Sequence, residues 1–258
     1  MIRYGNWRIW TAASVLLLCA FAYLFAPHDP YQIELGKRLL PPSAEYPFGT
    51  DSMGRCLLSR VLYGGRTTLG IVLLTWLATL AVGLPLGIAV GFWRGRFRAL
   101  GDSFLNVLAS IPPIVYLIVW MGAWGSGTNT VVVALTLASL VSLVKLVKAR
   151  AEIERDKAYV VCAAASGASR LRILFWHVPP NLIRESVVLL SLISADIVLM
   201  ISGFSFIGLG IGEGGIDWGA IMTDGRTVAL LRPDIMLYPL ALIVLCAFAF
   251  NVLGEELK

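Results

Sequence analysis

Residues 67–92 read TTLGIVLLTWLATLAVGLPLGIAVGF, a stretch without a charged side chain. A helix needs about 20 apolar residues to cross the hydrocarbon core of a bilayer. Charged residues stand close to both ends of the stretch, with Arg66 before it and Arg94 after it. The stretch therefore predicts a transmembrane helix rather than a buried helix of a soluble domain.

Further apolar stretches reach spanning length, and together they cover most of the chain. They lie at residues 9–26, 104–124, 130–147, 187–209 and 235–253. Of the 258 residues, 58% are hydrophobic and only 14% are charged, whereas a soluble domain carries about 25% charged residues. We therefore expect an all-α integral membrane protein with about six transmembrane helices.

The first apolar stretch shares features with a secretory signal peptide. Basic residues precede its apolar core, and residues 20–22 (AFA) resemble a signal-peptidase site. The apolar run nevertheless continues past that site to Ala26. We expect an uncleaved anchor, in which residues 1–8 are the N-terminus and residues 9–26 form the first transmembrane helix.

The distribution of Lys and Arg predicts which loops face the cytoplasm. With the N-terminus inside, two thirds of the 21 Lys and Arg residues fall on the cytoplasmic side, in agreement with the positive-inside rule. Both termini are then cytoplasmic, residues 27–66 are an extracytoplasmic segment, and residues 148–186 are the largest cytoplasmic loop. The net charge of +5 is spread over short loops, which fits membrane orientation better than a nucleic-acid surface.

Residue types that carry catalysis or bind metals are sparse and scattered. The four cysteines form no CxxC pair, and the two histidines, His28 and His177, fall on opposite sides of the predicted membrane. The chain shows no Ser/His/Asp set and no HExxH motif. We expect neither a catalytic site nor a metal site, and this argues against a membrane enzyme.

Residues 159–170, YVVCAAASGASR, form a run of small side chains on the predicted cytoplasmic loop. A loop outside the lipid has no need of such a run, which would build a short helix with a flat surface. Gly167 favours a turn, because glycine accepts a positive φ at little cost. A second short helix at 170–177 would follow, ended by two prolines. The two helices would form a knob, residues 159–180, that docks into a groove on a soluble partner.

This stretch resembles the cytoplasmic EAA loop of permease subunits of binding-protein-dependent ABC importers. In that loop Glu-Ala-Ala is followed by Gly and, further on, by Pro. Here Val161 stands at the position of Glu, and the Ala-Ala, Gly and Pro positions are filled by residues 162–163, 167 and 180. The ATPase-coupling residues that the resemblance implies are Tyr159, Val161, Cys162, Ala163, Ser166, Gly167, Ala168, Ser169, Arg170, His177 and Pro180.

Two further motifs resemble those of the dipeptide/oligopeptide/nickel permeases within that family. Their outer segment carries Gly-Thr-Asp-x-x-Gly-Arg-Asp-x-x-Ser-Arg, which residues 49–60 match except that Cys56 replaces the second Asp. Residues 205–210 (SFIGLG), followed by Trp-Gly at 218–219, are similar to the Ser-Phe-Leu-Gly-Leu-Gly…Trp-Gly stretch of the same proteins. The matching extracytoplasmic residues are Gly49, Thr50, Asp51, Gly54, Arg55, Ser59 and Arg60.

The resemblance covers about residues 27–255 and implies the type I ABC importer permease fold. Residues 67–258 would form its transmembrane domain, with five helices and the coupling loop at 148–186. The implied partners are a second homologous permease subunit in a heterodimer, two cytoplasmic ABC ATPases, an extracytoplasmic solute-binding protein and the lipid of a bacterial inner membrane. Closure of the ATPases would push on the knob, and the helices would rock between outward-open and inward-open states.

The chain itself carries no Gly-x-x-x-x-Gly-Lys-Ser/Thr phosphate loop. We therefore expect no enzymatic activity and no cofactor in this chain, since ATP and Mg²⁺ would bind the partner ATPases. A stand-alone secondary transporter or channel is the alternative, although such proteins often have more helices, inverted repeats and several buried charges. Dependence on a co-expressed ATPase would distinguish the two.

Charged residues raise two further hypotheses. Val161 stands where the family often has a glutamate whose carboxylate takes part in docking. Asp156, Glu154 or the partner permease would then have to supply this ionic contact. On the outer side, Asp51 and Arg55 are expected to pair and to order a turn that faces the binding protein or caps the outer mouth. The alternative is a structural turn with solvated charges, whose pair would contribute only ~0–1 kcal/mol.

Asp196 lies well inside the fifth apolar stretch, where a carboxylate costs about 2.5–3.5 kcal/mol. Such residues face a polar interior, so we expect Asp196, Met200, Ser202 and Ser205 to line a translocation path. The alternative is that Asp196 pairs with the partner subunit or a backbone group. A carboxylate with thioether and hydroxyl neighbours suits a cationic or metal-chelate solute.

The family imports di- and oligopeptides, or nickel and other metals. Many of its peptide permeases have a Glu shortly before Ser-Phe-x-Gly-Leu-Gly, where this chain has residues 201–203 (ISG). This difference slightly favours the nickel or metal-chelate branch of the family over the peptide branch.

Packing signals complete the sequence pattern. Glycines at 83, 87 and 91 repeat every four residues and predict close helix packing. Prolines at 85 and at 112–113 predict kinks in the second and third stretches. Trp120, Trp124 and Trp218 predict an aromatic belt at the outer membrane interface.

Overall fold

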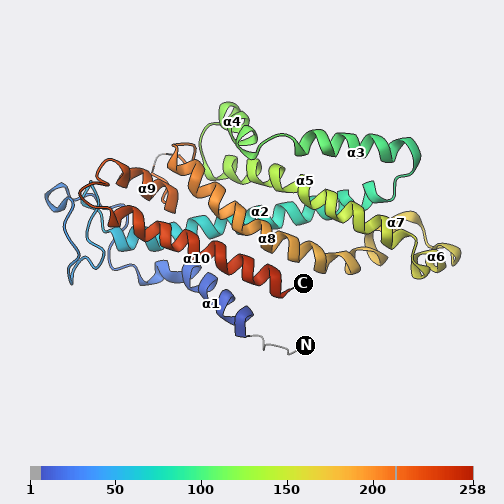
Figure 1. Cartoon of the computed structure of the whole chain (residues 1–258), viewed down its shortest axis with the longest axis horizontal. Coiled ribbons are helices and arrows are strands. Elements are labelled where there is room, and N and C mark those ends of the chain that lie inside the picture. Colours follow the sequence, from blue (N-terminus) through green and yellow to red (C-terminus); the bar gives the residue numbers. More distant parts are fainter. Residues whose placement is uncertain (1–6, 213, 258) are drawn as a thin grey trace.

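The apolar stretches fold into long helices that lie side by side in an elongated bundle, as the computed structural model shows (Figure 1). The structure describes residues 7–212 and 214–257, and within these ranges it contains helices and loops but no β-strand. The α-helices are α1 (Trp7–Phe21), α2 (Leu57–Gly91), α3 (Gly95–Ala109), α4 (Pro113–Trp124), α5 (Thr128–Arg155), α6 (Ala158–Ala165), α7 (Arg170–Arg172), α8 (Pro179–Phe206), α9 (Trp218–Arg226) and α10 (Asp234–Glu256). Short helical turns follow at η1 (Ala22–Phe25), η2 (Leu35–Lys37) and η3 (Ile173–His177).

Five helical segments of the described chain are long and apolar enough to cross a membrane: α1 with η1, α2, α5, α8 and α10. They confirm five of the predicted spans. The kink predicted at residues 112–113 is confirmed, because α3 and α4 meet at an angle of 79°, and the two helices form a sixth span if they are counted together. Pro112, in extended conformation with ψ 144°, separates the two helices, and Pro113 begins α4. A proline lacks the N–H donor for a continuing helix and disfavours helical conformation in the residue before it.

The other spans extend beyond their apolar cores. α2 begins at Leu57, inside the segment predicted to be an extracytoplasmic loop, and it continues as helix through Pro85. α5 continues to Arg155, which agrees with the expected extension of that helix by charged residues. α8 begins at Pro179, because a proline fits the first turn of a helix, where its missing N–H needs no partner.

The glycine row of α2 is in close contact with α5, as its spacing predicts. A Cβ added at Gly83 would lie 2.8 Å from Leu143, and one added at Gly87 would lie 2.6 Å from Cβ of Val147. Gly91 lies as close to the facing turn of α5. The absence of side chains lets the two backbones approach, so that packing contacts hold α2 and α5 together.

Replacing Gly87 with Val is expected to weaken the structure by about 1–3 kcal/mol, because overpacking forces the two helices apart. Gly70→Val is the matched control, since it lies on the same helix and an added Cβ meets nothing within 4 Å. Unfolding of both variants in mixed detergent micelles measures the difference. Equal losses of stability would show that α2 and α5 are not held by this contact.

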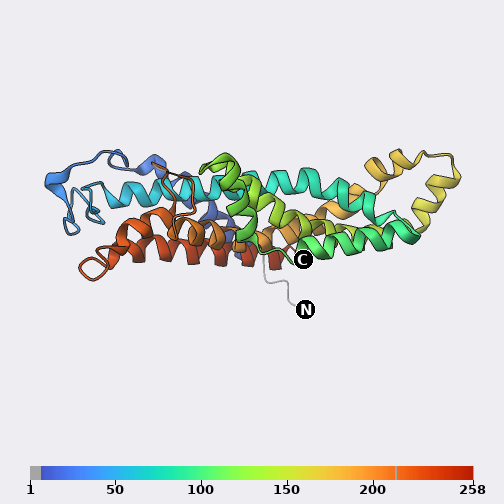
Figure 2. The ribbon, with the colours of Figure 1, turned by 90° about the horizontal axis from the view of Figure 1, so that it is seen from above.

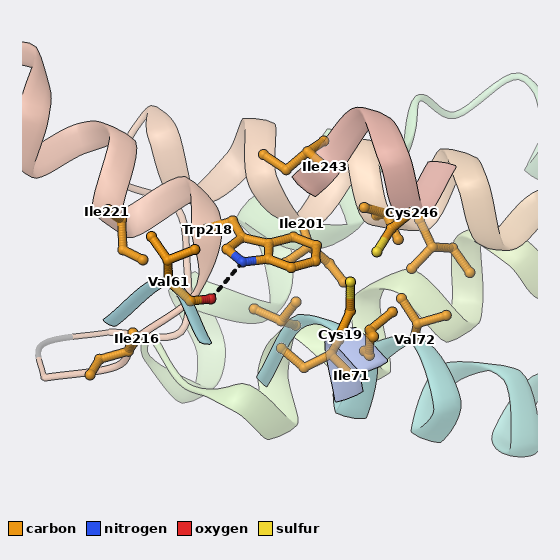
Figure 3. Packing of buried hydrophobic residues seen from close by; sticks show 14 of the residues in the cluster. Cys19, Val61, Ile71, Val72, Ile201, Ile216, Trp218, Ile221, Ile243 and Cys246 are labelled. Atoms are coloured by element: carbon orange, nitrogen blue, oxygen red, sulfur yellow. Dashed lines mark hydrogen bonds between the residues drawn. The ribbon is translucent and has the colours of Figure 1, made fainter. Parts of the chain in front are cut away.

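Trp218 lies in a hydrophobic core formed with α2, α8 and α10 and not in an interfacial belt, so that part of the aromatic-belt prediction is wrong. Its side chain is fully buried, and its indole Nε1 donates a hydrogen bond of 2.9 Å to the carbonyl of Val61 (Figure 3). Cys19 and Cys246, both buried, lie beside the ring. Because an indole N–H must be satisfied when it is buried, this bond fixes α9 against α2.

The two ends of the bundle carry different structures. At one end lie the loop 26–56, α9 and the start of α10, and at the opposite end α6 and α7 project beyond the other helices (Figures 1 and 2). The start of α1 and the end of α10 lie together, since Arg8 forms an ion pair of 2.6 Å with Glu256. The residues predicted to act on the two sides of the membrane therefore gather at the two ends of the bundle.

Candidate functional site

The knob at residues 159–180 consists of two short helices joined by a tight turn. Gly167 has a φ of +88° and lies between α6 and α7, with open space around it. Its neighbour Ala168 donates from its amide to the carbonyl of Ala163, which closes the turn. The hydroxyl of Ser169 accepts a hydrogen bond from the amide of Arg172 and caps the second helix. The turn and the two short helices agree with the prediction.

A chain of hydrogen bonds holds the knob to the long helices. The Tyr159 hydroxyl donates to Glu154 at 2.7 Å and accepts from the amide of Asn181 at 3.0 Å. Glu154 is at the end of α5 and Asn181 is near the start of α8. Burial, followed by the hydrogen bond to Glu154, raises the pKa of Tyr159. The resemblance pointed to Tyr159, but no sequence signal showed its contacts with Glu154 and Asn181.

The missing carboxylate at Val161 is not replaced by Glu154. Glu154 is buried at the end of α5, where it binds Lys157 and Tyr159. Asp156 is exposed and pairs with Arg155, and this hydrogen bond lowers its pKa. Asp156 is therefore the carboxylate of the two that a partner protein can reach.

The knob also exposes a group of large apolar side chains, which we call the apolar knob patch. Its members share high exposure and are distributed over α6, α7 and η3. They are Val161, Leu171, Phe175 and Trp176, with exposed fractions of 56%, 68%, 58% and 77%. Leu171, Phe175 and Trp176 were not among the predicted coupling residues, although the run ILFW at 173–176 lies in the loop predicted to be cytoplasmic.

At the opposite end, four charged side chains form what we call the outer charge cluster: Asp51, Arg55, Arg60 and Asp224. The buried carboxylate of Asp51 lies 2.7 Å from Nε of Arg55 and 2.5 Å from Nη1 of Arg60. Asp224 lies 2.8 Å from each of the same two guanidinium groups. The predicted Asp51–Arg55 pair forms, but it is buried and shared rather than solvated.

The cluster joins three parts of the chain: the outer loop, the first turns of α2 and helix α9. Asp224 was missed because it lies far from the motif in sequence, with no spacing to mark it. The turn around Asp51 depends on Gly49 and Gly54, whose φ values are +74° and +77°. Cys56, the residue that departs from the family motif, is buried and pairs by a single β-bridge with Thr50.

Arg232 also holds the outer loop against the start of α10. Its guanidinium donates to the carbonyls of Leu39 and Leu40 at 3.0 and 2.6 Å, and it forms an ion pair with Asp234. Thr50 is buried, and its hydroxyl donates to the carbonyl of Lys37. The outer loop is thus bound to the helices by two sets of contacts, those of the outer charge cluster and those of Arg232.

A cavity of about 540 Å³ lies beside the outer charge cluster. Arg55, Arg60 and Asp224 line one part of it, and the glycine-rich segment after α8 lines another. The Nε of Arg60 is buried with no hydrogen-bond partner among the described residues. Asp217 borders the cavity and caps α9, and burial raises the pKa of its carboxyl group.

The four residues predicted to line a translocation path do not share one face of α8. Asp196 is exposed and Met200 is half-buried, whereas Ser202 and Ser205 are buried. The hydroxyl of Ser205 donates to Asp217 at 2.9 Å, and the Ser202 hydroxyl has no partner in the described parts of the chain. Within residues 7–212 and 214–257, no group of three or more His, Cys, Asp and Glu side chains could hold a metal ion.

Comparison with known proteins identifies the family. Residues 83–255, more than half of the chain, match the model of the binding-protein-dependent transport system inner membrane component. The chain belongs to this family. As a permease of this family it is a multi-pass membrane protein, and its relatives are ABC importer permease subunits rather than ATPases.

Three curated relatives place the permease in a subfamily. It is 32% identical to a probable D,D-dipeptide transport system permease of Escherichia coli K12, over 96% of this chain and 85% of that protein. It is 28% identical to the nickel transport system permease of the same organism, over 98% and 93% of the two chains. A glutathione transport system permease of Pectobacterium atrosepticum is 30% identical, over 95% and 82%. The resemblance to dipeptide and nickel permeases is confirmed.

A solved structure supports the fold of the permease. A chain from inward-facing conformations of the MetNI methionine ABC transporter superposes with a TM-score of 0.57, at 20% sequence identity. The match covers 76% of this chain and 94% of that chain. The expected type I ABC importer permease fold is therefore confirmed.

Proposed function

We propose that this permease carries a small solute inward across a bacterial inner membrane and is driven by ATPases that bind its cytoplasmic knob. Both termini and the knob would face the cytoplasm, and the outer loop would face the opposite side. Two ATPase subunits would hold ATP and Mg²⁺, whereas this chain would bind no cofactor. Its own role would be to change between outward-open and inward-open states when the ATPases close.

The apolar knob patch is the observation that carries the proposal. Large apolar side chains exposed on a soluble-facing surface mark protein interaction sites, and a short helix can dock its apolar side into a groove. The Glu154–Tyr159–Asn181 hydrogen bonds tie the knob to α5 and α8. A force applied by a partner at Trp176 would therefore reach the membrane helices instead of bending a flexible loop.

The loop at the end of the bundle opposite the knob would bind a second kind of partner. The outer loop is held by the buried charge cluster and by Arg232, so it presents a fixed surface to an extracytoplasmic solute-binding protein. The cavity beside the cluster would receive the released solute. A second, homologous permease would complete the path in a heterodimer, because Asp196 on α8 forms no hydrogen bond or ion pair with the described residues, 7–212 and 214–257.

The solute is proposed to be a small peptide or a metal complex. The relatives named above are permeases for D,D-dipeptides, nickel and glutathione. Specificity in such systems depends largely on the binding protein. The permease would need a path that accepts the charge and size of the solute rather than a tight pocket.

Gly167→Trp in a tagged chain, purified from membranes of the natural host, is expected to lose the ATPases. Tryptophan is strained at a φ of +88° and adds bulk beside the docking surface. Mass spectrometry of the co-purified proteins measures the loss. Gly95→Trp is the matched control, because Gly95 also has a positive φ of +59°, open space around it and a position outside the knob.

The wild type and Gly95→Trp are expected to retain a second permease and the ATPases, and only Gly167→Trp should lose the ATPases. The co-purified binding protein would then indicate the solute class. Absence of any ATPase from the wild type in mild detergent would contradict the proposal and favour a stand-alone transporter. Equal retention by all three proteins would place the coupling surface elsewhere.

A further inference from the structure

One side of α8 remains exposed, although this helix lies in the middle of the bundle. α8 packs against α2, α5, α9 and α10, and Figure 1 shows it between α5 and α10. The exposed residues of its outer half recur at helical spacing and form one stripe: Asp196, Leu199, Gly203 and Ile207. An added Cβ at Gly203 would meet nothing within 4 Å.

Asp196 is the charged member of this stripe, and it lies deep in the membrane. It precedes the last residue of α8, Phe206, by ten positions, which corresponds to about 15 Å along a helix. The hydrocarbon core is about 30 Å thick, so the carboxylate falls near the middle. It makes no hydrogen bond or ion pair with any residue of 7–212 or 214–257.

A carboxylate at this depth cannot face lipid without a cost of about 2.5–3.5 kcal/mol. Carboxylates inside membrane segments therefore face a water-filled cavity or a polar partner. The stripe leads outward from Asp196 to Gly208, which lines the outer cavity. The exposed side of α8 thus connects the cavity at the outer charge cluster with the middle of the membrane.

We propose that Asp196 forms a cation-selective point in a water-filled path along α8, and that the solute of this permease crosses it carrying a positive charge. This inference rests on the proposed function, because it requires the assembled importer. The carboxylate would attract the positive group of the solute and repel anions of similar size. Ser202 and Ser205 are buried and lie off this exposed stripe, and Ser205 lines the outer cavity at its end.

Charged thiol reagents test the proposal without knowledge of the solute. Leu199→Cys places a thiol one helical turn from Asp196, and the whole complex is labelled with a cationic or an anionic methanethiosulfonate. Modification is measured residue by residue by mass spectrometry, so the exposed Cys162 can remain. The modification rate with each reagent is divided by the rate of the same reagent with a free thiol in solution, so that the two reagents can be compared. Leu199→Cys is expected to favour the cationic reagent by about tenfold, through the field of a nearby unit charge.

The same thiol in an Asp196→Asn background is expected to lose this preference while the thiol stays reactive. Asparagine has the size of aspartate, and co-purification of the partners shows that the complex is intact. Leu18→Cys is the lipid-side control, because Leu18 is 68% exposed on the peripheral helix α1. It should react with neither reagent.

Two results would overturn the inference. One is an unchanged cation preference in Asp196→Asn, and the other is a Leu199→Cys thiol that stays unreactive in a complex that retains its ATPases. Both would leave the coupling proposal intact, since that depends on the partners recovered with the knob. Loss of the ATPases from the wild type would instead refute the coupling proposal itself.

Discussion

Asp51→Asn is expected to lower the free energy of unfolding by about 3–5 kcal/mol, the usual cost of removing one partner from a buried ion pair. The Asp51 side chain is 1% exposed and that of Arg60 is 3% exposed. Without the carboxylate, two guanidinium groups would share Asp224 alone, and Asp224 is partly exposed. Denaturation in mixed detergent micelles, followed by tryptophan fluorescence, measures the loss.

Asp29→Asn is the control for the Asp51 variant. Asp29 lies on the same outer loop but is exposed, and its side chain accepts a hydrogen bond from the backbone amide of Tyr31. Surface substitutions of this kind change stability by about 0.5 kcal/mol. A loss below about 1 kcal/mol for Asp51→Asn would mean that the cluster adds little to the fold, and that its role is at the surface of the cavity.

Trp176→Glu is expected to weaken ATPase binding about thirtyfold or more. Trp176 is 77% exposed in η3. A tryptophan at the centre of an interface typically contributes about 2 kcal/mol or more, and each 1.4 kcal/mol changes Kd about tenfold. Glutamate also places a charge where an apolar contact is expected. Titration of the purified ATPase onto the detergent-solubilised permease measures the change.

Leu230→Glu provides the comparison for this substitution. Leu230 is fully exposed on the loop between α9 and α10, at the end of the molecule away from the knob. Leu230→Glu adds the same charge to an exposed apolar position that lies outside the knob, so ATPase binding should not change. Equal effects of the two substitutions would show that the apolar knob patch is not the docking surface.

Hydropathy predicted the transmembrane helices because each needs only length and apolar composition. Hydropathy alone does not show the break between α3 and α4, but the prolines at 112–113 predicted a kink there, and the angle of 79° could be known only from the fold. The glycine row of α2 predicted its packing, since backbone approach requires small residues whatever the neighbour is. The neighbour itself, α5, could be known only from the fold.

The candidate sites also contain contacts that local sequence predicts and contacts that only the fold reveals. The turn at Gly167 and the pair of Asp51 with Arg55 follow from local sequence. Asp224 does not, because its contact with Arg55 closes a loop of 169 residues. The apolar stretch around Asp196 predicted that this residue lies within a long helix, but only the neighbouring helices decide that it is exposed while Ser202 and Ser205 are buried.

The interlocked pair α2 and α5 has a mechanical consequence for the proposed coupling. The knob is attached at the end of α5, and the glycine contacts prevent α2 from separating, so the pair would act as a single lever. α5 has 28 residues and is about 42 Å long at 1.5 Å per residue. A tilt of about 10° along that length would displace one end by about 7 Å relative to the other, so a movement of the knob under the proposed coupling would be transmitted to the opposite end of the bundle.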